Sequence, residues 1–140
     1  MALKTGTIRQ KILISSATPE EVYDALVDPK KHSAFTGSKA TGVPKVGGQF
    51  TASDRYISGK HLALVKGKKI VQEWKTTEWP ENYESSILEV TLTTREGGTE
   101  LKMFQSKVPA SQVERYRDGW ITYYWEPLKE YFQRKDAKHS

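Results

Sequence analysis

Apolar and polar positions alternate with a period of two along much of the chain, which predicts a protein dominated by β-strands. Ile8, Ile12 and Ile14 recur on one face of a first predicted strand, over residues 7–15. From residue 39 onward, short alternating segments are separated by turns that contain glycine or proline, as in an antiparallel meander. Six further strands are predicted, over residues 39–41, 49–53, 56–65, 70–77, 83–94 and 99–107, with a bulge at Ser58-Gly59 inside the third of them.

Two short helices are predicted between the first strand and the meander. Thr18 has the position of an N-cap, with Pro19 as the first helical residue and Glu21 completing a capping box. Pro29 ends this helix because the residue before a proline avoids helical backbone angles. The same proline begins a second short helix that reaches residue 35.

A long helix is predicted over residues 111–135. Pro127 falls inside it and should kink it about one turn upstream, because proline lacks an N–H and its ring meets the preceding turn. On a helical wheel that starts at Val113, Arg117 lies at about 40°, within the apolar arc. The residues predicted to share the apolar side are Val113, Tyr116, Trp120, Ile121, Tyr123, Tyr124, Leu128, Tyr131 and Phe132.

This order of elements predicts an α+β fold of the helix-grip type. The first strand would join the edge of the meander, giving a curved seven-stranded antiparallel sheet with the long helix across its concave face. We expect one domain over residues 1–140, with its core over about residues 7–135 and a flexible tail over 136–140. A single helix cannot fill such a face along its whole length, so a cavity is expected there, and such cavities bind small molecules.

Composition and charge narrow the classes of function. The chain has 22 basic and 17 acidic residues and a net charge of +5, and most of the basic excess lies in residues 1–75. The cluster Lys66-Gly67-Lys68-Lys69 is interpreted as a hairpin turn, and basic residues do not interleave with aromatic ones as in a nucleic-acid-binding surface. No run of 18 apolar residues and no signal-peptide pattern is present, so we expect a cytoplasmic protein without membrane insertion.

Few residues suggest catalysis or metal binding. The chain has no cysteine, which excludes disulfides and thiolate chemistry. His32, His61 and His139 lack the spacing of metal ligands and are interpreted as surface or structural residues. No phosphate-binding loop, dinucleotide fingerprint or nucleophile elbow is present. We therefore expect no catalytic residue, no metal and no cofactor.

Several short motifs resemble one known family when taken together. The chain is similar to the activator of heat-shock-protein-90 ATPase homologue family, within the START-like, helix-grip superfamily. The similarity runs from about residue 8 to residue 132 and rests on segments such as Ala17-Thr18-Pro19-Glu20-Glu21-Val22-Tyr23, Ala34-Phe35-Thr36-Gly37, Val46-Gly47-Gly48-Gln49-Phe50, Ile70-Val71-Gln72-Glu73-Trp74-Lys75 and Gly119-Trp120.

The resemblance implies the helix-grip fold and a possible heat-shock-protein-90 partner. It is strongest for the C-terminal domain of the eukaryotic co-chaperone, whose separate N-terminal domain does much of the stimulation. We expect the 140 residues to leave no room for that domain. Superfamily relatives bind lipids, polyketides or phenolics in the central cavity.

The candidate site is the predicted cavity and its mouth. Trp74 is either a core residue or a cavity wall. Arg117 either extends to the rim as a structural residue or anchors the acidic head group of a ligand. Tyr124 and Tyr131 would add hydroxyls to an apolar wall, and residues 29–36 would form a gate. The candidate ligand-binding residues are Phe35, Phe50, Trp74, Arg117, Trp120 and Tyr124.

Two functions from different classes are therefore open. The first is a monomeric, non-enzymatic module that holds an apolar or amphipathic small molecule. The second is a co-chaperone-like protein that acts through its surface on a heat-shock-protein-90 chaperone. A cyclase-like enzyme is a third interpretation, but no clear acid–base pair supports it. A sealed, aromatic-filled interior favours the surface role, whereas an open tunnel of roughly several hundred Å³ favours ligand binding.

Overall fold

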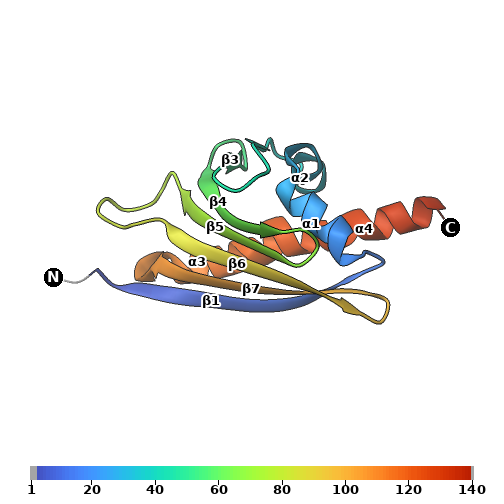
Figure 1. Cartoon of the computed structure of the whole chain (residues 1–140). Coiled ribbons are helices and arrows are strands. Elements are labelled where there is room, and N and C mark those ends of the chain that lie inside the picture. The colour runs from blue at the N-terminus through green and yellow to red at the C-terminus, as the bar shows by residue number, and fades with distance from the viewer. Residues whose placement is uncertain (1–2, 140) are drawn as a thin grey trace.

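A computed structural model, which describes residues 3–139, contains one seven-stranded antiparallel sheet in the order β1-β7-β6-β5-β4-β3-β2 (Figure 1). The first strand pairs with the last, from Thr5 opposite Pro109 to Ser15 opposite Gly98, and this confirms the predicted fold class. The strands are β1 (Thr5–Ser15), β2 (Thr41–Gly42), β3 (Gln49–Ala52), β4 (Ile57–Val65), β5 (Lys69–Thr76), β6 (Ser86–Arg95) and β7 (Gly98–Pro109).

Two short helices, α1 (Pro19–Val27) and α2 (Pro29–Thr36), follow β1 as predicted. The Thr18 hydroxyl accepts a hydrogen bond from the Glu21 backbone N–H at 3.2 Å. The Glu21 carboxylate accepts one from the Thr18 N–H at 3.0 Å, which completes the capping box. Gly37 ends α2 with a φ of 77°, a left-handed conformation that glycine adopts without strain.

The C-terminal helix is not a regular α-helix throughout. A 3₁₀ turn (Ala110–Gln112) leads into α3 (Val113–Trp120), a π-helical turn (Ile121–Trp125) and α4 (Glu126–His139), which continues past the predicted end at residue 135. In the π turn the N–H of Glu126 bonds to the carbonyl of Ile121. The irregularity predicted upstream of Pro127 therefore takes the form of this π turn.

The π turn changes which side chains face the sheet. Ile121 and Tyr123, predicted on the apolar side, are 43% and 68% exposed, whereas Trp125 is only 1% exposed. The prediction was wrong at Ile121 and Tyr123 and did not include Trp125. A π turn holds one residue more than an α-turn. That extra residue rotates the following side chains by about 100° relative to a regular wheel.

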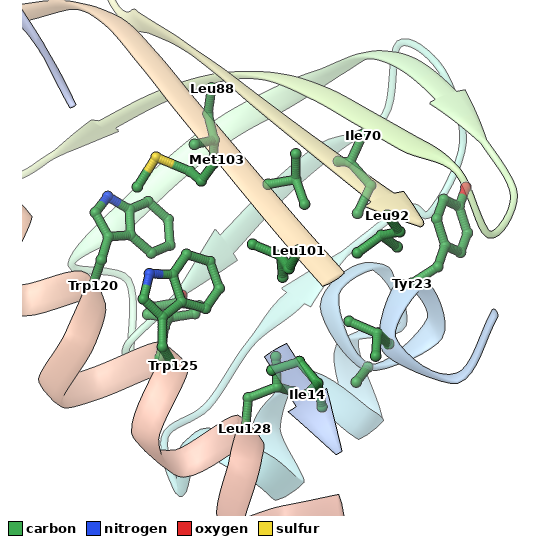
Figure 2. Packing of buried hydrophobic residues seen from close by; sticks show 14 of the residues in the cluster. Ile14, Tyr23, Ile70, Leu88, Leu92, Leu101, Met103, Trp120, Trp125 and Leu128 are labelled. Atoms are coloured by element: carbon green, nitrogen blue, oxygen red, sulfur yellow. The ribbon is translucent and has the colours of Figure 1, made fainter. Parts of the chain in front are cut away.

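The core lies between the concave face of the sheet and the C-terminal helix. Trp120 and Trp125 point from the helix toward the sheet, where Leu88, Leu101 and Met103 are also buried (Figure 2). The two indole rings are stacked, with centroids 5.2 Å apart and planes 13° from parallel. This aromatic layer fills much of the space that the sheet and helix would otherwise enclose.

The bulge predicted at Ser58-Gly59 lies elsewhere, because the register of β4 against β5 shifts between His61 and Ala63. Gly59 pairs directly with Phe50 of β3. A Cβ atom at Gly59 would collide with the backbone oxygen of Glu73 and would lie 2.7 Å from Cζ of the Phe50 ring. The glycine therefore permits the ring to pack over the strand, where it stacks on His61 with centroids 5.1 Å apart.

Candidate functional site

The predicted cavity between sheet and helix is present but small, with a volume of about 50 Å³. Space of this size admits water molecules, not a drug-sized ligand. Four of the six predicted binding residues line it, namely Phe50, Trp74, Trp120 and Tyr124. All but Phe50 are at most 6% exposed, so these side chains fill the interior.

A larger cleft of about 570 Å³ opens beside α3. It shares Trp74, Trp120 and Tyr124 with the central cavity and therefore lies at its mouth. Its remaining lining residues are Ser38, Ser53, Tyr56, Ile57, Glu78, Arg115, Tyr116, Gly119 and Tyr123. The cleft is thus a concave feature of a size that suits a small organic molecule.

Two predicted binding residues lie outside both spaces. Phe35 is buried and packs edge-on against Tyr124, with ring centroids 5.9 Å apart. Arg117 is exposed and lines neither space, and Gln10 of β1 donates a hydrogen bond to its backbone carbonyl at 2.9 Å. Arg117 therefore lies on the flank of α3 that faces β1.

The opposite flank of the C-terminal helix borders the cleft and carries Arg115 and Gly119 of α3 and Tyr123 of the π turn. The helical wheel placed Arg117 inside the apolar arc because it treated that arc as one surface. The arc has two flanks, however, and only one of them is next to the cleft. The four-residue spacing of Arg115, Gly119 and Tyr123, which follows one helix face, is the sequence signal that could have identified this flank.

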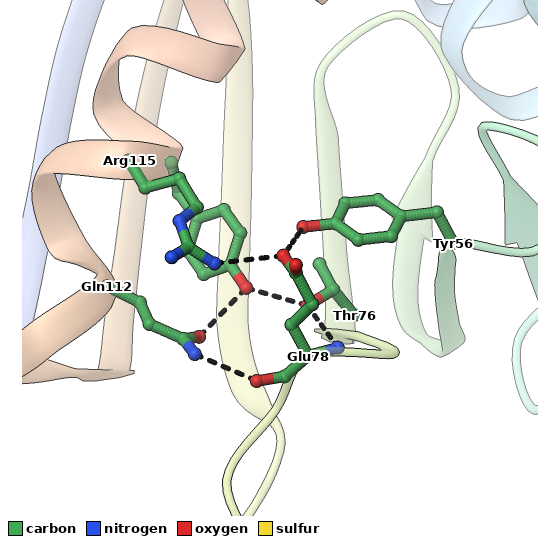
Figure 3. Close-up of polar contacts among 6 residues, drawn as sticks. Tyr56, Thr76, Glu78, Gln112 and Arg115 are labelled. Carbon is green, nitrogen blue, oxygen red and sulfur yellow. Dashed lines mark hydrogen bonds and ion pairs between the residues drawn. The ribbon is translucent and has the colours of Figure 1, made fainter.

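A polar cluster formed by Tyr56, Glu78 and Arg115 lies at the rim of the cleft (Figure 3). One carboxylate oxygen of Glu78 accepts hydrogen bonds from the Tyr56 hydroxyl at 2.6 Å and from the Arg115 guanidinium at 2.9 Å. The hydrogen bond from Tyr56, and then the Arg115 charge, lower the pKa of Glu78. Burial and the hydrogen bond to Glu78 raise the pKa of Tyr56. This rim cluster joins α3, the segment after β5 and the residue that precedes β4.

Further hydrogen bonds hold α3 against the same segment. The Gln112 side chain donates to the backbone carbonyl of Glu78 at 2.8 Å and accepts from the Tyr116 hydroxyl at 2.8 Å. That hydroxyl also lies 2.6 Å from the Thr76 hydroxyl. The wall of the cleft is therefore fixed by side-chain hydrogen bonds from several elements.

His32 and His61 are buried and border the central cavity. Nδ1 of His32 is buried and has no hydrogen-bond partner among the described residues. Burial lowers the pKa of His32 to about 4 and also lowers the pKa of His61. Nδ1 of His61 lies 3.4 Å from the Gln72 amide nitrogen. Among residues 3–135, whose side chains are described, no three His, Asp or Glu side chains lie close enough together to hold a metal ion.

Comparison with known proteins identifies the family. Residues 16–133 match the family described as Activator of Hsp90 ATPase homolog 1-like protein. The chain is 36% identical over 126 residues to the human Activator of 90 kDa heat shock protein ATPase homolog 1, covering 90% of this chain and 36% of that relative. The mouse counterpart is 34% identical with the same coverage. The chain belongs to the Hsp90 ATPase activator homologue family, and it spans about a third of the length of these relatives.

Solved structures agree with the fold. A crystal structure of an HSP90 activator from Plasmodium falciparum is 24% identical with a TM-score of 0.79, covering 94% of this chain and 97% of that one. The crystal structure of Ara h 8.0201 is 13% identical with a TM-score of 0.74, covering 94% and 99%. At these identities the likeness concerns the fold alone, which is the helix-grip fold. In addition, no helix within residues 3–139 is long and apolar enough to cross a membrane.

Proposed function

We propose that this chain is a non-enzymatic accessory domain that binds a 90 kDa heat shock protein through its surface. The observation that carries the proposal is the filled interior, because a central cavity of about 50 Å³ leaves the surface as the place for a large partner. The family and the names of the human and mouse relatives, which are ATPase activators of that chaperone, indicate which partner to test.

Exposed lysines without an ion pair are candidate contacts on that surface. Lys30 on α2, Lys45 before β3, and Lys66 and Lys68 in the β4–β5 turn are all exposed. None of them has a carboxylate within 4.0 Å among the residues whose side chains are described, 3–135. Such charges attract an acidic partner and raise the rate of encounter with it. We therefore propose that the contact with the chaperone includes a set of four lysines, called the lysine side: Lys30, Lys45, Lys66 and Lys68.

The test is a calorimetric titration of the chain into purified 90 kDa heat shock protein from the organism that makes the chain. The proposal predicts a saturable complex whose affinity falls as the salt concentration rises, because exposed charges are screened by salt. Absence of binding at a chaperone concentration of about 100 μM in low salt would contradict the proposal. It would mean a dissociation constant above about 100 μM, or a binding free energy weaker than about 5.5 kcal/mol.

A second function, the binding of an apolar or amphipathic small molecule, is supported by the cleft of about 570 Å³ beside α3. Its volume lies within the range of roughly 300–1,000 Å³ that ligand pockets have, and six of its 12 lining residues are aromatic. Native mass spectrometry of the protein purified from its source tests this function. A retained small molecule supports it, and a protein that carries no extra mass after exposure to a cell extract opposes it.

A further inference from the structure

Gly119 lies in the middle of the C-terminal helix without a packing reason to be glycine. Glycine is among the poorest helix formers, because it loses the most backbone freedom on folding. A Cβ atom at this position would meet only Cδ2 of Tyr123, at an ordinary contact distance of 3.9 Å. By contrast, a Cβ at Gly59 would lie 2.7 Å from the Phe50 ring. The missing side chain at Gly119 therefore relieves no clash inside the fold, and it leaves space in the cleft that this residue lines.

Irregular backbone borders the cleft on two sides. On the helix side is the π turn, Ile121–Trp125, which carries the lining residues Tyr123 and Tyr124. On the sheet side, Ser53, Asp54 and Arg55 form a run of three left-handed residues with φ angles of 50°, 56° and 73°. Such conformations cost energy in non-glycine residues, and both kinds of irregularity concentrate at ligand sites. Together with Gly119, they mark the cleft as a built feature.

The lining of the cleft defines the chemistry of its ligand. Six aromatic side chains contribute to it, Tyr56, Trp74, Tyr116, Trp120, Tyr123 and Tyr124. The rings offer stacking and edge-to-face contacts to a flat molecule. The charged lining residues, Glu78 and Arg115, neutralise each other at 2.9 Å. Ser38, Ser53 and Tyr56 bring hydroxyls that can bond a polar edge.

We propose that the cleft beside Gly119 binds an uncharged, planar aromatic molecule that carries a hydroxyl or carbonyl group. This inference rests on the second function proposed above and states its site and ligand class. The ring system lies against the helix backbone at Gly119, between Trp74, Trp120 and the rim cluster. Its polar group bonds to the hydroxyls at the rim. An acid is disfavoured, because its carboxylate would meet that of Glu78 and compete with it for Arg115.

The experiment uses 2-naphthol as the neutral probe and 2-naphthoate as the charged one, with binding followed by the fluorescence of the cleft tryptophans. Wild-type protein should bind 2-naphthol more tightly than 2-naphthoate. Gly119→Leu should weaken 2-naphthol binding by about tenfold or more, because the new side chain occupies the cleft. Asp118→Leu, which adds the same side chain at an exposed neighbouring position, should leave binding unchanged. Glu78→Gln frees Arg115 and should narrow the gap between the two probes.

Melting temperatures show whether the variants fold. Gly119→Ala should raise the melting temperature by about 4 °C, since alanine favours a helix and has room here. If wild-type protein fails to bind 2-naphthol at millimolar concentration, or if Gly119→Leu binds it as tightly as wild type, the inference is wrong. A molecule retained in native mass spectra of both wild type and Gly119→Leu would uphold the ligand-binding function but place its site elsewhere. No retained molecule and no bound probe would contradict both.

Discussion

The indole N–H of Trp120 donates a hydrogen bond of 2.9 Å to the side-chain oxygen of Gln105, which is completely buried in β7. The amide nitrogen of Gln105 donates in turn to the Ser86 hydroxyl at 3.0 Å, and that hydroxyl donates to the backbone carbonyl of Trp74 at 2.6 Å. Three buried hydrogen bonds therefore connect the C-terminal helix to β7, β6 and β5. They fix the depth at which the aromatic layer sits on the sheet.

Replacing Gln105 should be costly for this reason. Gln105→Leu leaves the Trp120 N–H unpaired in the core, and a buried polar group without a partner costs about 1–3 kcal/mol. We expect urea unfolding to show a loss of that size, with the slope of the transition unchanged. Gln133→Leu, the same change at an exposed position on α4, is the control and should alter stability by less than about 0.5 kcal/mol. A Gln105→Leu protein as stable as wild type would show that the chain of hydrogen bonds contributes little.

Truncation of Trp120 should cost much stability and truncation of Arg117 almost none, although both residues were predicted to border the cavity. Trp120→Ala removes a ring that is 5% exposed and should cost about 3–5 kcal/mol. Arg117→Ala alters an exposed side chain and should stay within about 0.5 kcal/mol. It should also leave the affinity for 2-naphthoate unchanged, because Arg117 lies away from the cleft. Thermal melts beside fluorescence titrations measure both quantities, and weaker binding of the acid by Arg117→Ala would restore Arg117 as an anchor.

His32 should make the fold sensitive to acid. Burial lowers its pKa from the ordinary 6.5 to about 4, so the unfolded chain binds a proton at a higher pH than the folded chain does. Stability should therefore decrease as the pH falls from about 6.5 to about 4, by about 3 kcal/mol at roughly 1.4 kcal/mol per pKa unit. His61, whose pKa is also lowered by burial, acts in the same direction.

The variant His32→Leu tests the assignment to His32. At pH 7 it should be about as stable as wild type, because it removes a buried nitrogen that has no partner among the described residues. At pH 4.5 it should be the more stable of the two in urea unfolding. Equal loss of stability by both proteins between these pH values would show that another group is responsible.

The chain should stimulate the chaperone's ATPase activity only weakly, because it matches only part of the length of the activators that it resembles. The 140-residue chain matches 36% of the length of the human activator. We expect these residues alone to change the rate of ATP hydrolysis weakly, even at concentrations that saturate binding. A steady-state ATPase assay with increasing amounts of chain measures this. Strong stimulation at a near-stoichiometric ratio would mean that this part of the family suffices for activation.

The fold was predictable because its signals are local. Alternation, turn residues and the capping box at Thr18 each act within a few neighbouring residues, and the structure confirms them. The π turn was predictable only as a disturbance near Pro127, because its form depends on packing between helix and sheet. For that reason the exposure of Tyr123 and the burial of Trp125 were missed.

The candidate site was predictable in part. Aromatic residues at the helix–sheet interface were expected, and Trp74, Trp120 and Tyr124 border both the cavity and the cleft. The size of the cavity was not predictable, since it depends on how aromatic rings interlock across elements. The pairing of Glu78 with Arg115 joins segments far apart in sequence, so no local pattern revealed it. The cytoplasmic location, the single domain and the monomeric state stay predictions.

The measurement that tests the account most directly is the affinity of the chain for the 90 kDa heat shock protein before and after charge reversal on the lysine side. The account predicts that Lys30→Glu with Lys45→Glu weakens binding by about tenfold or more at low salt. The control, Lys129→Glu with Arg134→Glu, reverses two charges on α4 that already have acidic neighbours, Glu126 and Glu130, and should bind nearly as wild type does. If both double variants lose affinity equally, the lysine side is not the contact. If wild type shows no complex at all, the proposed function itself is contradicted.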